Sequence, residues 1–357
     1  MPCSHVRLVF ALSALLFVPL AGCGERTTDP ADRRPHAPTP DGTAAGVVLL
    51  EDFTTRQVFP PDNWWNLDVS SAPVDGNSTT YIDFVSGRDP SHPTATRSLH
   101  PDFGPPPYGI PYVGVSGSQA HLPLTWTYYG DQSDDGAVGL PPGYPIPDEA
   151  RLLPNYIEGG EAGGGSSGDR HLLLVDRDNW RLFETWYTEW NPVAARWEAG
   201  SGATFNLATN DRRPEEWTSA DAAGLAIFPG LVRYDEVSAT APIRHAFRVT
   251  VRATNGYVWP ASHEAGNRVG ALPMGARLRL KAGKDITGFP TEAQKIFQAM
   301  KTYGLIVADN GSDMYISGTM DARWDIDILN PAFSQLKADD FEVILLGWQP
   351  GTSGVPE

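Results

Sequence analysis

The stretch that decides the fold is residues 171–187, HLLLVDRDNWRLFETWY. Its apolar run ends at Val175, and three of the next four residues, DRDN, are Asp or Asn, whose short polar side chains are typical of a tight turn. From Trp180 to Tyr187 the sequence is rich in aromatic side chains, which favour strands. Two such runs joined by a short turn predict a β-hairpin.

Short apolar runs between Gly and Pro turns continue on both sides of this hairpin. The chain has 36 glycines and 32 prolines, and helical periodicity is rare. We therefore expect a mainly β protein, a single domain with a β-sandwich or jelly-roll-like arrangement and a few short peripheral helices. In residues 244–252 apolar and polar side chains do not alternate regularly, so the sequence does not determine which face of that strand is buried. Further strands are expected at residues 203–207, 230–237, 243–253, 276–282, 305–308, 314–317 and 341–346.

The best helix candidate covers residues 291–303. Thr291 and Gln294 have the spacing of a capping box, and Gly304 has the residue type that commonly ends a helix. Apolar side chains at helical spacing predict one face packed on a sheet. A second short helix is expected to begin at Asn330-Pro331, and a third to cover residues 219–224.

Residues 1–22 have the layout of a secretion signal. Arg7 lies in a short basic start, and the apolar run that follows, residues 8–20, is too short to span a bilayer with ease. The junction LAGC, which ends at Cys23, resembles the lipobox of bacterial lipoproteins, in which cleavage precedes the cysteine and its sulfur receives a diacylglycerol. The alternative is an ordinary secretion signal followed by an incidental cysteine.

A polar tether is expected to follow this junction. Residues 23–46 are rich in Pro, Thr, Asp and Arg, and they cannot bury enough apolar surface to offset the entropy of ordering. Residues 47–357 contain no second segment of this kind and are predicted to form one β-rich domain. The predicted location is the extracytoplasmic cell envelope, on the periplasmic face or the cell surface, and the predicted membrane contact is the lipid on Cys23.

The composition argues against several classes of function. The only cysteines are Cys3 and Cys23, and Cys3 would leave with the signal. This count excludes disulfides, thiolate catalysis and cysteine-ligated zinc from the domain. The formal net charge is −16 and no basic stripe offsets it, which argues against nucleic acid as a partner.

Three short motifs have the letters of a known signature without its context. Residues 164–168 fit the esterase pattern G-x-S-x-G but lie in a Gly/Ser tract, and Ser334 with Lys337 fits S-x-x-K without companion motifs. Residues 131–136 (DQSDDG) resemble the first half of a calcium loop, but Pro142 occupies the position of the closing glutamate. No cofactor is therefore predicted, with a lone structural calcium at this turn as the alternative.

Aromatic side chains beside polar ones point to carbohydrate. The chain has 11 tryptophans, and a flat indole face packs well on the C–H face of a sugar while neighbouring polar groups bind its hydroxyls. Core packing is the alternative for each tryptophan. The candidates for substrate binding are Trp65, Trp186, Trp324, Arg170 and His171.

Acidic and imidazole side chains lie at the ends of several predicted strands. Acid–base chemistry needs one proton-bearing and one ionised group, and glycoside hydrolysis needs two carboxyl groups about 5–10 Å apart. Surface ion pairs and turn capping are the alternatives for these residues. The candidates for catalysis are Asp221, Glu236, Asp309, His245 and His263.

Several longer strings resemble a family of secreted bacterial proteins. They are GDRH (168–171), WTSADAAGL (217–225), PGLVRYDEV (229–237), IRHAFRVTV (243–251), ADNGS (308–312) and RWD (323–325). The resemblance extends over residues 63–341, apart from the Gly-rich insert before GDRH and the Ser262-His263 pair. It implies a secreted protein but no particular reaction, so it transfers no residue role.

The sequence therefore favours a cell-envelope lipoprotein whose β-sandwich domain binds, and in one version hydrolyses, a carbohydrate polymer. The first alternative is a non-catalytic structural or adhesive envelope protein, in which the aromatics are core and the acids are surface. The second is a metal-dependent hydrolase, which would need His171, His245 or His263 to meet a carboxylate, although these residues lack close ligand spacing.

Overall fold

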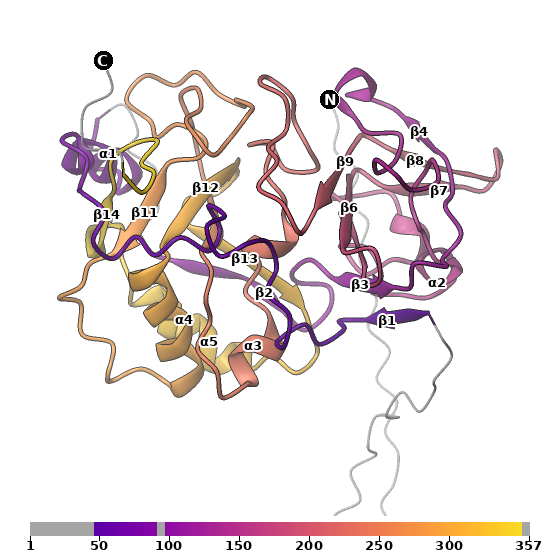
Figure 1. Ribbon diagram of the computed structural model, residues 1–357. Helices are drawn as coiled ribbons and strands as arrows, with labels where there is room; N and C mark the ends of the chain where they lie inside the picture. The colour runs from indigo at the N-terminus through magenta and orange to yellow at the C-terminus, as the bar shows by residue number, and fades with distance from the viewer. Residues whose placement is uncertain (1–45, 91–96, 352–357) are drawn as a thin grey trace, which may run out of the picture. The chain divides into compact units, whose positions relative to one another are not determined.

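The computed structural model describes residues 46–90 and 97–351 (Figure 1). In these ranges 14 strands form three sheets, and five short α-helices lie outside them. The prediction of a mainly β domain with β-sandwich character is confirmed. The described residues belong to one compact unit, Ala44–Glu357. The predicted signal peptide, Cys23 and residues 24–45 of the tether lie outside the described residues.

The predicted hairpin is the centre of a five-stranded sheet. β5 pairs antiparallel with β6, and Leu174 lies opposite Phe183. β3 pairs with β5 in parallel, and β9 pairs with β6 antiparallel. The order of strands is β1 (Val47–Leu49), β3 (Tyr112–Val115), β5 (Leu172–Asp176), β6 (Arg181–Trp186) and β9 (Ser201–Asn206).

Both faces of this sheet are buried, which explains the continuous apolar run that identified β5. Leu173 and Val175 point into the main hydrophobic core, whereas Leu172 and Leu174 point into a second core. Because side chains alternate along a strand, a strand between two cores needs apolar residues at every position.

A small three-stranded sheet covers the second core. Trp197 of this sheet is buried with Phe183 of the five-stranded sheet. Two stacked sheets with a shared core are the arrangement of a β-sandwich. The strands are β4 (Leu124–Trp126), β8 (Arg196–Ala199) and β7 (Glu189–Asn191).

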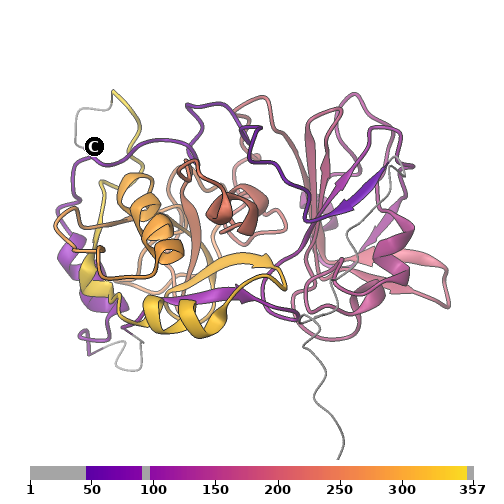
Figure 2. The ribbon, with the colours of Figure 1, turned by 90° about the horizontal axis from the view of Figure 1, so that it is seen from below.

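A six-stranded mixed sheet forms the remainder of the domain. Helices α4 (Thr291–Thr302) and α5 (Ile326–Ser334) contact each other, and they contact β11 and β2, respectively (Figures 1 and 2). α1 (Ser78–Val85) contacts the edge strand β14. The order is β14 (Phe341–Val343), β11 (Arg277–Leu280), β12 (Leu305–Asn310), β10 (Phe247–Val251), β13 (Tyr315–Met320) and β2 (His100–Gly104).

The apolar face of α4 is confirmed, but its predicted capping box is wrong. Ile296 and Phe297 are fully buried in the main core. The helix is capped by Pro290 without a side-chain bond, and the Gln294 amide donates instead to the Phe289 carbonyl at 2.7 Å. Gly304 follows the helix with φ of 76°, where a Cβ would meet the backbone of β11.

Three other sequence-based elements differ from the structure. The helix expected at Asn330-Pro331 begins earlier, because the Asp325 carboxylate caps α5 and Pro331 lies inside it. The strand expected at residues 230–237 is wrong, since a 3-10 turn (Phe228–Gly230) leads into helix α3 (Tyr234–Ser238). Residues 219–224 form turns rather than a helix. Helix α2 (Asp148–Leu152) lies in the long connection between β4 and β5.

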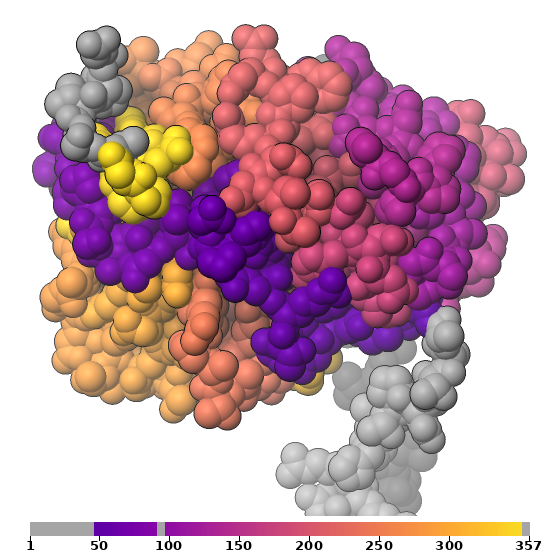
Figure 3. Space-filling view, in the orientation of Figure 1, coloured from indigo at the N-terminus to yellow at the C-terminus, as the bar shows by residue number. Residues whose placement is uncertain are grey.

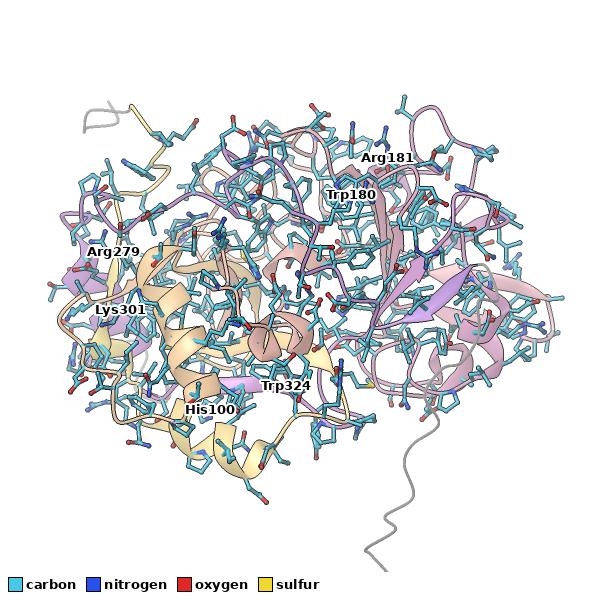
Figure 4. The ribbon with its side chains drawn as sticks, turned by 60° about the horizontal axis from the view of Figure 1, so that its bottom comes forward. His100, Trp180, Arg181, Arg279, Lys301 and Trp324 are labelled. Atoms are coloured by element: carbon cyan, nitrogen blue, oxygen red, sulfur yellow. The ribbon has the colours of Figure 1, made fainter. Side chains whose placement is uncertain are left out.

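The N-terminal segment joins the parts of the domain. In Figure 3 the indigo residues lie across the face of the molecule, between the orange and the magenta parts of the chain. Arg279 of β11 (labelled in Figure 4) donates to the Ala72 carbonyl at 3.0 Å and pairs with Glu342 at 2.6 Å. Arg277 donates to the Trp64 carbonyl, and burial lowers the pKa of Arg277 to about 9. No helix among residues 46–90 and 97–351 has the length and apolar character needed to cross a membrane.

A buried carboxyl group connects the five-stranded sheet to the turn before α3. Glu184 of β6 is fully buried, and its oxygens accept hydrogen bonds from the backbone N–H groups of Ile227 (2.8 Å) and Phe228 (2.8 Å). Burial raises the pKa of Glu184 to about 7, although the two N–H donors act in the opposite direction.

This raised pKa predicts a pH-dependent stability. Below the ordinary value of 4.5 the carboxyl is protonated in both the folded and the unfolded chain. As pH rises towards 7, only the unfolded chain loses the proton readily, so the free energy of unfolding should fall by about 3 kcal/mol. Urea unfolding between pH 4.5 and 8 measures this fall. Glu184→Gln should remove this contribution of about 3 kcal/mol, and the exposed Glu292→Gln should keep it. An unchanged slope in Glu184→Gln contradicts the assignment.

Candidate functional site

A polar pocket of about 210 Å³ lies where the two larger sheets approach each other. Its walls come from the residues before β5, the turn at residues 218–222, the segment at 263–265, the end of β12 and the end of β6. Half of the ten substrate-binding and catalytic residues predicted from the sequence line it. They are His171, Trp186, Asp221, His263 and Asp309.

Arg248 of the central strand β10 holds the two aspartates together. It is 3% exposed, and its Nη2 bonds Asp221 Oδ1 at 3.0 Å and Asp309 Oδ2 at 3.2 Å. Because both oxygens bond one nitrogen, they lie within about 6 Å of each other. Nη1 donates to Ser317 Oγ at 2.7 Å. Sequence analysis missed Arg248, since it appeared there only as an irregularity in the alternation of its strand.

Asp221 is too deeply buried to meet a substrate. Its side chain is 0% exposed, and its carboxylate is paired with Arg248. Its backbone N–H donates to Ser219 Oγ at 2.9 Å, and its carbonyl accepts from Thr218 Oγ1 at 3.2 Å. Asp221 therefore fixes the turn that forms one wall of the pocket, and it is a positioning residue.

Asp309 is the accessible member of the pair. Its side chain is 29% exposed, and its Oδ1 accepts the backbone N–H of Asn310 at 2.7 Å. Burial raises the pKa of Asp309 to about 6, against the opposing charge of Arg248. A carboxyl group with a pKa near the working pH can both carry and release a proton.

His171 is a fixed cation rather than a proton carrier. Its Nδ1 bonds Glu158 Oε2 at 2.7 Å, and its Nε2 bonds the Ala220 carbonyl at 3.1 Å. Burial lowers the pKa of His171, but the charge and hydrogen bond of Glu158 outweigh burial and raise it to about 9. Both ring nitrogens therefore keep their protons, and the ring ties β5 to the turn that contains Asp221.

His263 presents one free ring nitrogen. Its Nδ1 lies 2.8 Å from the Ala222 carbonyl, which can only accept, so Nδ1 carries the proton. Nε2 has no hydrogen-bonding partner among the described residues. His263 therefore retains an unoccupied nitrogen in the polar pocket.

Exposed aromatic side chains lie at the edge of the pocket. Trp186 and Tyr129 line it, with ring centroids 6.3 Å apart, and Tyr128 lies 5.7 Å from Trp186. Tyr128 is 61% exposed and Tyr129 41% exposed. The Trp186 indole donates to Asp169 Oδ1 at 3.1 Å, which fixes the ring. We call Tyr128, Tyr129 and Trp186 the aromatic rim. Its two tyrosines could have been found in the sequence from their position in a long loop that contains glycine.

Two of the three predicted tryptophan platforms are core residues. Trp65 is fully buried, and its ring fills the space above Gly230. Trp324 is 5% exposed and packs against Phe103 at 4.9 Å (Figure 4). Neither has a face free for a sugar, so the prediction of Trp65 and Trp324 as stacking residues is wrong.

Arg170 is also buried rather than open to a ligand. It is 1% exposed, and its guanidinium lies 3.7 Å from the ring centroid of Tyr187. Tyr187 in turn packs against Trp186 at 5.4 Å. Arg170 therefore supports the aromatic rim from inside the protein, which corrects its assignment as a substrate-binding residue.

Glu236 and His245 lie in a different cavity and do not join Asp221 and Asp309. They bond each other, with His245 Nε2 at 2.9 Å from Glu236 Oε2. Burial raises the pKa of Glu236, but the charges of Arg233 and His245 outweigh burial and lower it to about 2. So acidic a carboxyl does not carry a proton at neutral pH, which corrects its assignment as an acid–base residue.

The three short motifs, the calcium-like turn, G-x-S-x-G and S-x-x-K, make ordinary structural contacts. Asp134 in the calcium-like turn pairs with Arg213 at 2.5 Å, and Asp135 accepts the Trp126 indole N–H at 2.9 Å. In the described part of the chain no three His, Cys, Asp or Glu side chains are grouped to hold a metal ion. Residues 164–168 begin at the buried end of a 3-10 turn and continue as an exposed loop at 166–168 with no helix after it, and Lys337 donates to the Ser334 carbonyl at 2.5 Å.

Comparisons of the chain with family models, curated proteins and solved structures found no match. The resemblance to a family of secreted bacterial proteins therefore stays a prediction. The chemistry of the polar pocket follows from its geometry alone.

The different burial of the two aspartates predicts different effects on stability. Asp221→Ala leaves Arg248 buried without its main partner, and breaking such a pair costs about 3–5 kcal/mol. Asp309→Ala should cost less than half as much, because its carboxylate is partly hydrated. Urea unfolding of both variants measures the difference. Equal losses of stability would mean that Asp221 is not the main partner that compensates the buried charge of Arg248.

Proposed function

We propose that this protein is a lipid-anchored, extracytoplasmic protein whose polar pocket binds a carbohydrate polymer and hydrolyses its glycosidic bond. The observation that supports this best is the aromatic rim beside a pocket with an accessible carboxyl group of raised pKa, Asp309. Aromatic faces and a few fixed polar groups are the features of a sugar-binding pocket.

The binding step would use the aromatic rim together with polar side chains that line the pocket. Tyr128 and Trp186 offer exposed or partly exposed ring faces next to the polar pocket. Asp169, which is exposed, and Asn310, which is partly exposed, line the same pocket and can bond sugar hydroxyls. A polymer chain would lie over the rim, with one unit entering the pocket.

The hydrolytic step would use the two carboxyl groups that remain accessible. We assign Asp309 as the proton donor to the leaving oxygen, because burial raises its pKa to about 6. Asp169 is exposed, lines the pocket and is held by the Trp186 indole, so it is assigned as the base that takes a proton from a water molecule. The oxygen of that water bonds to the anomeric carbon as the glycosidic bond breaks. His263 Nε2 is available to relay a proton. Asp221 and Arg248 keep Asp309 in place.

The anchor at Cys23 predicts how the full chain partitions. Cys23→Ser should move the protein from the detergent phase to the aqueous phase in a Triton X-114 extraction, because the acyl chains would be lost. Cys3→Ser is the matched control, since this cysteine precedes the cleavage point, and it should stay in the detergent phase. An equal distribution of the two variants contradicts lipidation.

A glycan array probed with the full chain tests carbohydrate binding. Tyr128→Ala should weaken binding to the preferred glycan about fivefold, the loss of one aromatic contact worth about 1 kcal/mol. Tyr108→Ala is the control, because Tyr108 is also 61% exposed but belongs neither to the pocket lining nor to the aromatic rim. If no glycan binds, the proposed function is wrong and a structural or adhesive role becomes the better hypothesis.

Release of reducing ends from the bound glycan tests hydrolysis. Asp309→Asn should lower the rate about a hundredfold or more, whereas the exposed Asp327→Asn should not. Since the proton donor must be protonated, the wild-type rate should fall as pH rises through about 6. Binding without release would restrict the function to recognition. Loss of activity in EDTA would favour the metal-dependent hydrolase.

A further inference from the structure

A second cavity, of about 350 Å³, lies between the N-terminal segment and helix α3. It shares no lining residue with the polar pocket. Its walls are residues 53–58, the end of the 3-10 turn with α3, and residues 241–245. We call it the cationic cavity because its charged lining residues are Arg56, Arg233, Arg244 and Glu236, with His245 beside them.

Three guanidinium groups around one cavity are unexpected in a chain of net charge −16. The single lining carboxylate, Glu236, uses both oxygens inside the protein, Oε1 on Arg233 at 2.7 Å and Oε2 on His245 at 2.9 Å. Arg244 is exposed and makes no ion pair among the described residues. Arg56 stacks over Trp180 at 3.5 Å and donates to a carbonyl, which leaves its charge uncompensated.

Arg233 lies in the wall of this cavity with two donor nitrogens that have no hydrogen-bonding partner among the described residues. The side chain is 2% exposed, and these two nitrogens are Nε and Nη1. Nε forms a buried ion pair with Asp235 Oδ1 at 3.4 Å, but this contact does not have the geometry of a hydrogen bond. A buried donor without an acceptor is costly and calls for an explanation, and at the wall of a cavity a bound acceptor supplies one.

The surroundings hold Arg233 in this position. Its guanidinium lies 4.9 Å from the Phe228 ring centroid, and Glu236 fixes Nη2. The Asp235 carboxylate accepts the Phe53 N–H at 3.1 Å, which ties the cavity wall to α3. The fork of N–H groups is therefore oriented before any ligand arrives, and this geometry suits a carboxylate, sulfate or phosphate.

We infer that the cationic cavity binds a small organic oxyanion, whose acid group contacts Arg233 and Arg244. Phe53, Val58 and Pro242 provide an apolar wall for the body of the ligand. The volume suits a molecule of the size of an acidic monosaccharide. This inference is independent of the proposed function of the polar pocket.

The test is calorimetric titration of the full chain with glucuronate and glucose 6-phosphate, and with glucose and inorganic phosphate as comparison ligands. We expect at least one organic acid to bind more tightly than inorganic phosphate, and glucose not to bind. Arg244→Gln should weaken acid binding at least tenfold. Its side chain is exposed and unpaired, so the fold should persist.

Arg196→Gln is the matched control, because Arg196 is also exposed but lies on the three-stranded sheet outside the cavity. It should leave acid binding unchanged. Failure of both acids to bind, or equal weakening by the two substitutions, overturns the inference. Binding of inorganic phosphate as tightly as the organic acids overturns the assigned ligand class.

Discussion

The arrangement of the domain depends on one buried charge, the guanidinium of Arg248. It lies in the middle strand of the six-stranded sheet, where an unpaired charge would be strongly unfavourable. Asp221 reaches it from a turn and Asp309 from the neighbouring strand β12. The Ala220 carbonyl in the same turn also bonds His171, which directly precedes β5 of the five-stranded sheet. This single cation therefore fixes the wall between the two sheets.

Local patterns predicted the parts of the fold that local interactions form. The apolar run and polar turn of residues 171–187 gave the β5–β6 hairpin, and the apolar stripe gave α4. The error at residues 230–237 has a tertiary cause. Asp235 accepts the N–H of Phe53, which is 182 residues away in sequence, and Glu236 bonds Arg233 one helical turn back. These contacts stabilise α3 against the strand preference of the apolar residues before it.

The candidate site was only half predictable, because contacts between distant parts of the chain decide which side chains meet. Of the five catalytic candidates, three line the polar pocket, whereas Glu236 and His245 line the cationic cavity. The sequence could not separate Trp186 from Trp65, because their exposure depends on which distant chain covers each ring. Trp186 packs over Gly200 at the edge of the sheet, whereas Trp65 packs over Gly230 in the core. The sequence also could not identify Arg248, because the order of the strands in the sheet determines which side chains Arg248 bonds.

In both cavities a charge inside the protein orients side chains of the opposite charge, and the two cavities differ in which charge is inside. In the polar pocket a buried cation, Arg248, holds carboxylates, of which Asp309 remains accessible. In the cationic cavity a carboxylate, Glu236, holds Arg233 and His245 while exposed arginines complete the lining. In each case the charge inside compensates part of the charge that faces the ligand, so the fold tolerates groups that would otherwise repel one another. A chain without disulfides in its domain can therefore present an acidic and a basic cavity on one framework, because each accessible charge is oriented by an opposite charge in the protein interior.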